Sequence, residues 1–103
     1  MIEINVQQIP NQEFMRIIDN VRYTIKLRTF HDLTIADITI NEKPVKNGVR
    51  VLANELLIPY KYLTKGGNFM FVCPNEDNPH YTKFGVTQQL VYLDDSEIKE
   101  IYG

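Results

Sequence analysis

Apolar and polar residues alternate along the first forty positions of the chain, which predicts short β-strands. The alternation is clearest from Val21 to Phe30, where apolar side chains fall on one face and basic or polar side chains on the other. Further strands are predicted over Ile2–Ile9, Phe14–Ile18 and Leu33–Ile40. In the last of these, Ala36, Ile38 and Ile40 share a face.

Turn-forming residues separate these strands at short intervals. Asp19-Asn20 is suited to a two-residue hairpin turn because both residues tolerate the left-handed region, and His31-Asp32 also turns the chain. Asn41–Pro44 predicts another tight turn, Val45–Gly48 a second one, and Val49–Leu52 the start of a further strand. We therefore expect an all-β, mainly antiparallel fold, either a small barrel or a sandwich built from hairpins.

The second half of the chain contains two apolar segments joined by a long polar loop. Asn68–Val72 is apolar on both faces, which predicts a strand buried on both sides with Phe69 and Phe71 in the core. Gln89–Leu93 resumes the strand pattern. The loop between them, centred on Asn75–Gly85, is at the long end of the normal range, and long ordered loops are often functional.

Two segments have a less regular pattern. Glu55–Ile58 is apolar, but Pro59 makes it an edge strand or the end of a strand. Tyr60 and Tyr62 follow without a clear period, so this stretch forms either a flap over the end of the domain or a surface for a partner.

The C-terminal residues differ in pattern from the rest of the chain. Ile98, Ile101 and Tyr102 have near-helical spacing after a run of acidic residues, which predicts a short docking helix. We expect a single β-domain over residues 1–93 and a C-terminal tail over residues 94–103.

Length and composition agree with one soluble globular domain. The chain has 103 residues, of which 44% are hydrophobic and 23% charged. With 11 basic and 13 acidic residues the net charge is -2, so the chain as a whole does not attract nucleic acid or an anionic membrane. No segment approaches the roughly 20 apolar residues of a membrane span, and we expect synthesis in a cytoplasm.

One charge pattern requires two interpretations. Arg22, Lys26 and Arg28 share a face of the predicted strand, with Arg16 across the hairpin. The simpler interpretation is a solvated face that discourages unwanted strand pairing. The alternative is a site for an acidic partner or a nucleic-acid backbone, although no aromatic residue for base stacking is interleaved.

The sequence offers no constellation that would support catalysis. Cys73 is the sole cysteine and is expected to be structural, and His31 and His80 have no metal-ligand spacing. Glu76 and Asp77 could offer oxygens to a hard cation, but Pro79 interrupts the run and a turn cluster is the preferred interpretation. No enzyme activity, metal, cofactor or small-molecule substrate is expected.

Several stretches, in order along the chain, resemble the small baseplate plug proteins of contractile-tailed bacteriophages. The similarity is densest between Gly67 and Tyr92. Tyr81 stands where the family often has tryptophan, and Asn78 stands where it tends to have an acidic residue. The stretches that resemble the family are Ile4–Phe14, Val21–Leu27, Ala36–Ile40, Pro44-Val45, Gly48–Val51, Gly67–Val72, Asp77–Pro79, Tyr81, Phe84-Gly85 and Leu90–Tyr92.

The resemblance implies a virion structural protein of the tail baseplate that plugs or organises the hub end of the tail tube. The implied partners are the hub and other tail proteins, with homo-oligomers inside the baseplate left open, and no nucleic acid or membrane. The alternative from a different class is a small β-barrel module that binds single-stranded nucleic acid through the basic face. The residues expected to contact a partner are Tyr60, Tyr62, Asn75, Glu76, Asp77, Asn78 and His80.

Overall fold

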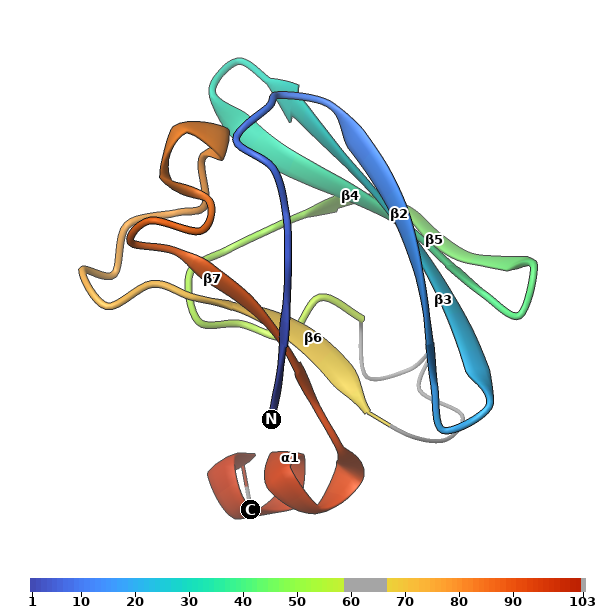
Figure 1. The fold of residues 1–103 in the computed structure, drawn as a ribbon. Helices are drawn as coiled ribbons and strands as arrows, with labels where there is room; N and C mark the ends of the chain where they lie inside the picture. The colour runs from blue at the N-terminus through green and yellow to red at the C-terminus, as the bar shows by residue number, and fades with distance from the viewer. Residues whose placement is uncertain (59–66, 103) are drawn as a thin grey trace.

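Two antiparallel sheets face each other, and a short helix lies at one end of the molecule (Figure 1). The computed structural model describes residues 1–58 and 67–102. The four-stranded sheet has the order β2 (Gln12–Ile18), β3 (Val21–Phe30), β4 (Leu33–Ile40), β5 (Lys43–Arg50). The three-stranded sheet has the order β1 (Ile2–Ile4), β7 (Gln89–Leu93), β6 (Asn68–Val72). A 3-10 helix, η2 (Tyr81–Lys83), precedes β7, and α1 (Asp95–Tyr102) follows it. The all-β prediction is confirmed, and the sheets form a sandwich rather than a closed barrel.

Three two-residue turns join the strands of the larger sheet. Asp19 and Asn20 have φ of 52° and 64°, and the same left-handed pair of angles recurs at His31-Asp32 and at Asn41-Glu42. Positive φ at both central residues defines a type of two-residue hairpin turn, and the twist of this turn matches that of the flanking strands. All three turns were predicted, although the third occupies only Asn41-Glu42 and β5 begins directly after it.

The core lies between the two sheets. Tyr23, on β3, contacts Phe69 edge to face with 5.1 Å between ring centroids, and Phe69 contacts Tyr92 at 5.3 Å. Phe71 stacks on Phe84 at 4.9 Å. Phe69 and Phe71 are fully buried, as predicted. The other fully buried aliphatic side chains of this core include Ile25, Leu27, Ile38, Leu57, Ile58 and Leu90.

Helix α1 covers the outer face of the smaller sheet. Met70, Val91 and Leu93 form a second buried cluster, and Ile98 of the helix packs against it. Strand β6 is therefore buried on both faces, as its sequence predicted. The predicted helix is confirmed, but Ile98 provides the packing, while Ile101 remains 53% exposed.

The start of α1 is a capping box. The carboxylate of Asp94 accepts a hydrogen bond from the Glu97 amide at 2.8 Å, and Glu97 accepts one from the Asp94 amide at 3.1 Å. Hydrogen bonds from Ser96 and the Glu97 amide lower the pKa of Asp94. The second oxygen of Glu97 contacts the amino group of Met1. These bonds satisfy amide groups that an α-helix leaves free at its first turn.

Gly67 occupies a position where the chain approaches β7 very closely. A Cβ at this residue would lie 1.9 Å from the Leu93 carbonyl oxygen and 2.6 Å from the Tyr92 ring. The Gly67 amide also donates to the Tyr92 hydroxyl at 3.1 Å. The tight entry into β6 therefore depends on the missing side chain.

Two predicted strand boundaries were wrong. The first strand spans Ile2–Ile4 instead of Ile2–Ile9, because its pairing with β7 stops at Ile4–Leu90, and β7 itself extends only one residue further, to Gln89. Beyond it, the Gln12 side chain donates to the Gln7 carbonyl at 2.7 Å in place of a sheet partner.

The second error concerns β5. Val45–Gly48 does not turn, and Val49–Leu52 does not begin a new strand. The strand runs without interruption from Lys43 to Arg50, with register shifts against β4. Gly48 has φ of +73°, and its amide donates to the Asp37 carboxylate at 2.8 Å, so the glycine forms an irregularity within a strand.

The Glu55–Ile58 segment lies along the free edge of β6. Leu56 forms an isolated bridge with Met70, and the Leu57 amide donates to the Phe69 carbonyl at 2.8 Å. The segment thus borders the edge of β6, as an edge strand would, but it forms an isolated bridge and not a strand. The following residues, including Pro59, Tyr60 and Tyr62, lie outside the described part of the chain. Among the described residues, no helix is long and apolar enough to cross a membrane.

We predict that the Cys73 thiol is inert in the folded protein. The side chain is fully buried, its sulfur donates to the Phe71 carbonyl at 3.6 Å, and burial raises the pKa of the thiol. Labelling by Ellman's reagent should be on the order of 10³-fold slower in the native protein than in urea-unfolded protein, because reaction requires opening. Comparable rates in both states would contradict this burial.

We predict that Asp94→Ala lowers the melting temperature by about 5 °C because α1 loses its N-cap. Asp95→Ala is the matched control, since it removes an exposed carboxylate whose contact is the i,i+4 pair with Lys99. Thermal melts followed by circular dichroism would test both variants. Equal melting temperatures for the two would refute the role of the capping box.

Candidate functional site

The loop between β6 and β7 leaves the sheet in a tight turn. The Glu76 amide donates to the Cys73 carbonyl at 2.9 Å, and Glu76 adopts φ of 58°. The chain then passes through η2 and reaches Gly85, whose φ of +75° reverses it toward β7. The positive φ of Gly85 permits this re-entry turn, since glycine has no Cβ to clash there.

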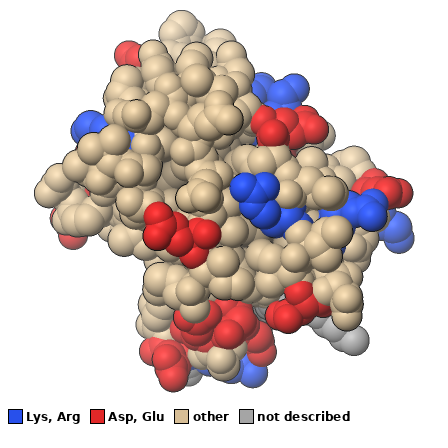
Figure 2. All heavy atoms as spheres, in the orientation of Figure 1, with Lys and Arg blue, Asp and Glu red and all other residues tan. Residues whose placement is uncertain are grey.

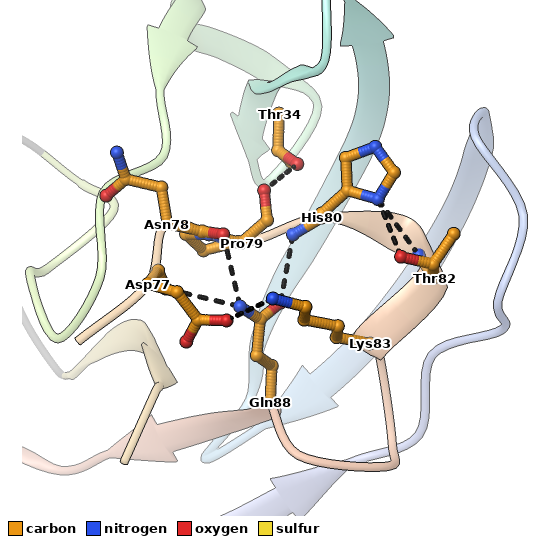
Figure 3. A network of polar contacts seen from close by, with 8 residues as sticks. All are labelled: Thr34, Asp77, Asn78, Pro79, His80, Thr82, Lys83 and Gln88. Carbon is orange, nitrogen blue, oxygen red and sulfur yellow. Dashed lines mark hydrogen bonds and ion pairs between the residues drawn. The ribbon is translucent and has the colours of Figure 1, made fainter. Parts of the chain in front are cut away.

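A buried glutamine holds this loop from inside (Figure 3). The Gln88 side-chain oxygen accepts a hydrogen bond from the His80 amide at 2.9 Å. Its nitrogen donates to the carbonyls of Asp77 at 3.2 Å and Asn78 at 3.1 Å. One side chain thus satisfies three backbone groups on the opposite arm of the loop. Leaving such groups buried and unpaired would cost about 1–3 kcal/mol each.

Three further contacts attach the loop to neighbouring segments. The Thr34 hydroxyl of β4 donates to the Pro79 carbonyl at 2.7 Å in a buried position. The Asn78 side chain accepts from the Ala53 amide at 3.2 Å. Nε2 of His80 lies 3.5 Å from a carboxylate oxygen of Asp32, in the β3–β4 turn. The loop is therefore fixed against the larger sheet as well as against itself.

The charged residues of the loop form an ion pair across it. The Lys83 ammonium donates to the Asp77 carboxylate, and this bond lowers the pKa of Asp77 below its usual value. His80 caps η2 because its Nδ1 accepts from the Thr82 amide at 3.3 Å. These contacts engage the Asp77 carboxylate and the His80 imidazole within the loop, whereas the Glu76 carboxylate has no ion pair among the described residues.

The predicted contact residues differ in how far they reach the surface. Asn75, Glu76 and Asn78 are exposed, whereas Asp77 and His80 are half-buried and engaged in the network. A partner surface would require an exposed tip over Asn75–His80, but Pro79 within this tip is buried. Pro79 is drawn inward because its carbonyl bonds to the sheet.

Sequence reasoning missed the residues that hold the loop in place. Gln88, Thr34 and Lys83 were not singled out, and Asp32 was assigned only to a turn. A polar residue next to a strand gives no sign that it will be buried. The long-range partners of Gln88 and Thr34 are set by the folded arrangement.

The described residues contain no group of three or more His, Cys, Asp or Glu side chains that could hold a metal ion. Glu76 closes a turn that begins at Cys73, and Asp77, just beyond it, is paired with Lys83.

The basic face of β3 is balanced by carboxylates. Arg28 bonds to Asp37 at 2.9 Å, and Arg22 bonds to Glu42 at 2.5 Å. Partial burial would raise the pKa of Asp37, but hydrogen bonds from Arg28 and the Gly48 amide outweigh it and lower the pKa. These pairs favour the interpretation of a solvated strand face over a nucleic-acid site.

Arg16 does not belong to this face, contrary to the prediction. It pairs in register with Tyr23, so it points to the same side of the sheet as that buried residue and away from Arg22. Figure 2 shows basic and acidic side chains interspersed over the side with the larger sheet, and acidic side chains gathered around α1.

The comparisons with known proteins identify the family. The family described as "Cyanophage baseplate Pam3 plug gp18" matches residues 1–96 of the chain. No curated protein matches. The matched range includes both sheets, the β6–β7 loop and the start of α1. The chain therefore belongs to this family of phage baseplate plug proteins, structural components of the virion tail that interact with other tail proteins.

Proposed function

We propose that this protein plugs or organises the hub end of a phage tail tube through protein–protein contacts, and that the tip of the β6–β7 loop makes one of them. The family match over residues 1–96 supports the plug role, and the buried Gln88 side chain, which joins the two arms of the loop, supports the tip as a preformed contact surface. A surface that is already ordered loses less conformational entropy on binding. A protein that closes the tail tube by binding its neighbours needs such an ordered surface and needs no catalytic group.

Glu76 is the side chain at the tip best suited to a contact. It is exposed and adopts a left-handed conformation that glutamate rarely favours. Glu42 shares that conformation, but its carboxylate bonds to Arg22. Within the described residues, Glu76 has no such ion pair, so its carboxylate is available to a basic residue of a partner. Residues that break a local preference without a local gain are expected at functional positions.

Neighbouring polar groups widen this surface. Asn75 and Asn78 are exposed in the same segment as Glu76. Exposed polar side chains on an ordered loop are a common composition for a recognition surface. The partner patch we propose is therefore basic, with groups that can bond to these amides.

We predict that Glu76→Lys reduces incorporation of the protein into tail particles by about tenfold or more while leaving its fold intact. Reversal of one charge at the centre of a contact costs about 1.4 kcal/mol or more, equivalent to a tenfold weaker complex. Purified particles assembled with the variant chain would be assayed by quantitative mass spectrometry, with the melting temperature of the isolated variant measured in parallel.

Glu100→Lys serves as the control, because it makes the same charge reversal at an exposed position on α1. Normal incorporation of Glu76→Lys would overturn the assignment of the contact to the tip. Deletion of Asn75–His80 is not a suitable test, because it would remove the buried Pro79 and the partners of Gln88 and thereby destabilise the domain.

A further inference from the structure

Strand β2 forms a free edge of the larger sheet. It pairs with β3, and the sheet order places no strand on its other side among the described residues. The two-residue turn at Asp19-Asn20 makes Ile18 and Val21 the hydrogen-bonded pair that closes the hairpin. Hydrogen-bonded and non-hydrogen-bonded pairs then alternate along the two strands.

This alternation determines which backbone groups face outward. The pairs formed by Glu13, Met15 and Ile17 are the non-hydrogen-bonded ones, so the amides and carbonyls of these residues point away from β3. The Met15 carbonyl is seen in that position, because Nη1 of Arg16 donates to it at 2.9 Å. At alternate positions along its seven residues, β2 thus presents amides and carbonyls that no described strand pairs, although Arg16 occupies the Met15 carbonyl.

The other edges of the two sheets are shielded or short. Strand β5 has Pro44 and a register irregularity at Gly48, and β6 is covered by Glu55–Ile58. Strand β1 has three residues. Proline, irregularities and coverage are the usual means of preventing strand pairing. Strand β2 has none of them in the described structure, and its register with β3 is regular throughout.

The exposed face of this edge carries two apolar side chains after Glu13. Met15 is 48% and Ile17 61% exposed, and they alternate with inward-facing residues along the strand. A shallow depression at the hairpin end is lined by Ile17, Asn20, Arg22, Asn41 and Glu42. A strand placed beside β2 would cover both apolar side chains and seat one of its own side chains near the depression.

Arg16 indicates the charge of the occupant. Its guanidinium lies 5.4 Å from the Phe14 ring centroid and, in the described structure, has no carboxylate partner. An added strand would take over the Met15 carbonyl with its own amide and release the guanidinium. A carboxylate opposite Arg16 on the added strand would then be the matching group.

A second copy of β2 cannot supply that carboxylate. Paired residues in an antiparallel ladder point to the same face, and Glu13 lies on the opposite face from Arg16. If two copies of β2 paired antiparallel about a two-fold axis at Met15, Arg16 of one copy would lie opposite Phe14 of the other. If the axis lay at Arg16, the two Arg16 guanidinium groups would lie opposite each other. The geometry therefore favours a different polypeptide.

We propose that β2 is a strand-addition site for an extended segment of another baseplate protein. The segment carries apolar residues beside Met15 and Ile17 and an acidic residue opposite Arg16. This inference rests on the proposed function for the identity of the partner as a tail protein. It uses a surface separate from the β6–β7 loop, so the two can fail independently.

The test compares edge variants in assembled tail particles. Ile17→Lys places a charge on the edge, and Met15→Pro removes an outward-facing amide; both should lower incorporation about tenfold or more. Ile17→Val and Met15→Thr keep the amide and a β-forming side chain and should incorporate within about twofold of the unchanged protein. Melting temperatures of the isolated variants separate a binding defect from a folding defect.

A photo-crosslinking residue in place of Ile17 then identifies the occupant. Adducts to a different tail polypeptide, at a segment of alternating apolar and acidic residues, would support the inference. Adducts to a second copy of this chain, or adducts that do not map to an extended acidic segment, would overturn it. If both edge variants are incorporated normally while Glu76→Lys is not, the strand-addition site is overturned and the proposed function stands. If all three variants are incorporated normally, both the strand-addition site and the contact at the loop tip are refuted.

Discussion

The hydrogen bonds of the buried Gln88 side chain are the interaction on which the candidate surface depends. They join the start of the long loop to its end and replace the water that three backbone groups would otherwise require. A rigid sandwich below the loop gives those bonds a fixed base, because the Thr34 hydroxyl ties Pro79 to the larger sheet. The shape of the tip is thus a consequence of the core, although the tip itself contributes little apolar burial.

The strands and hairpins of the larger sheet could be predicted because their causes are local. Alternation of apolar residues indicated which face of Val21–Phe30 is buried, and Asp19-Asn20 indicated a turn with two left-handed residues. Asn68–Val72 was correctly predicted to be buried on both faces, because apolar residues occupy both of its sides. Local sequence also predicted the helix at Asp95–Tyr102.

Features that depend on contacts distant in the sequence could not be predicted. The length of β1 depends on where its pairing with the distant strand β7 stops, and Gly48 forms an irregularity in a strand because Asp37 of the neighbouring strand binds its amide. The face of Arg16 is different, because the predicted two-residue turn places Ile18 opposite Val21 and therefore Arg16 opposite Tyr23, so this face could have been derived from the sequence. The burial of Gln88 had no signal at all, since glutamine is usually exposed.

The two surfaces we propose for partners lie on different parts of the sandwich and use different physics. The loop tip presents side chains held by a polar network, and β2 presents backbone groups beside apolar side chains. Both surfaces must already be ordered in the isolated protein. The loop depends on this more than β2 does, because no strand in the described part of the chain pairs with its backbone. Hydrogen exchange of the His80 amide in the isolated protein tests this most directly. We expect strong protection, close to that of the core strands, and its loss in Gln88→Met, which keeps the side-chain length but removes the acceptor. Exchange in the unchanged protein as fast as in an unstructured peptide would contradict the account.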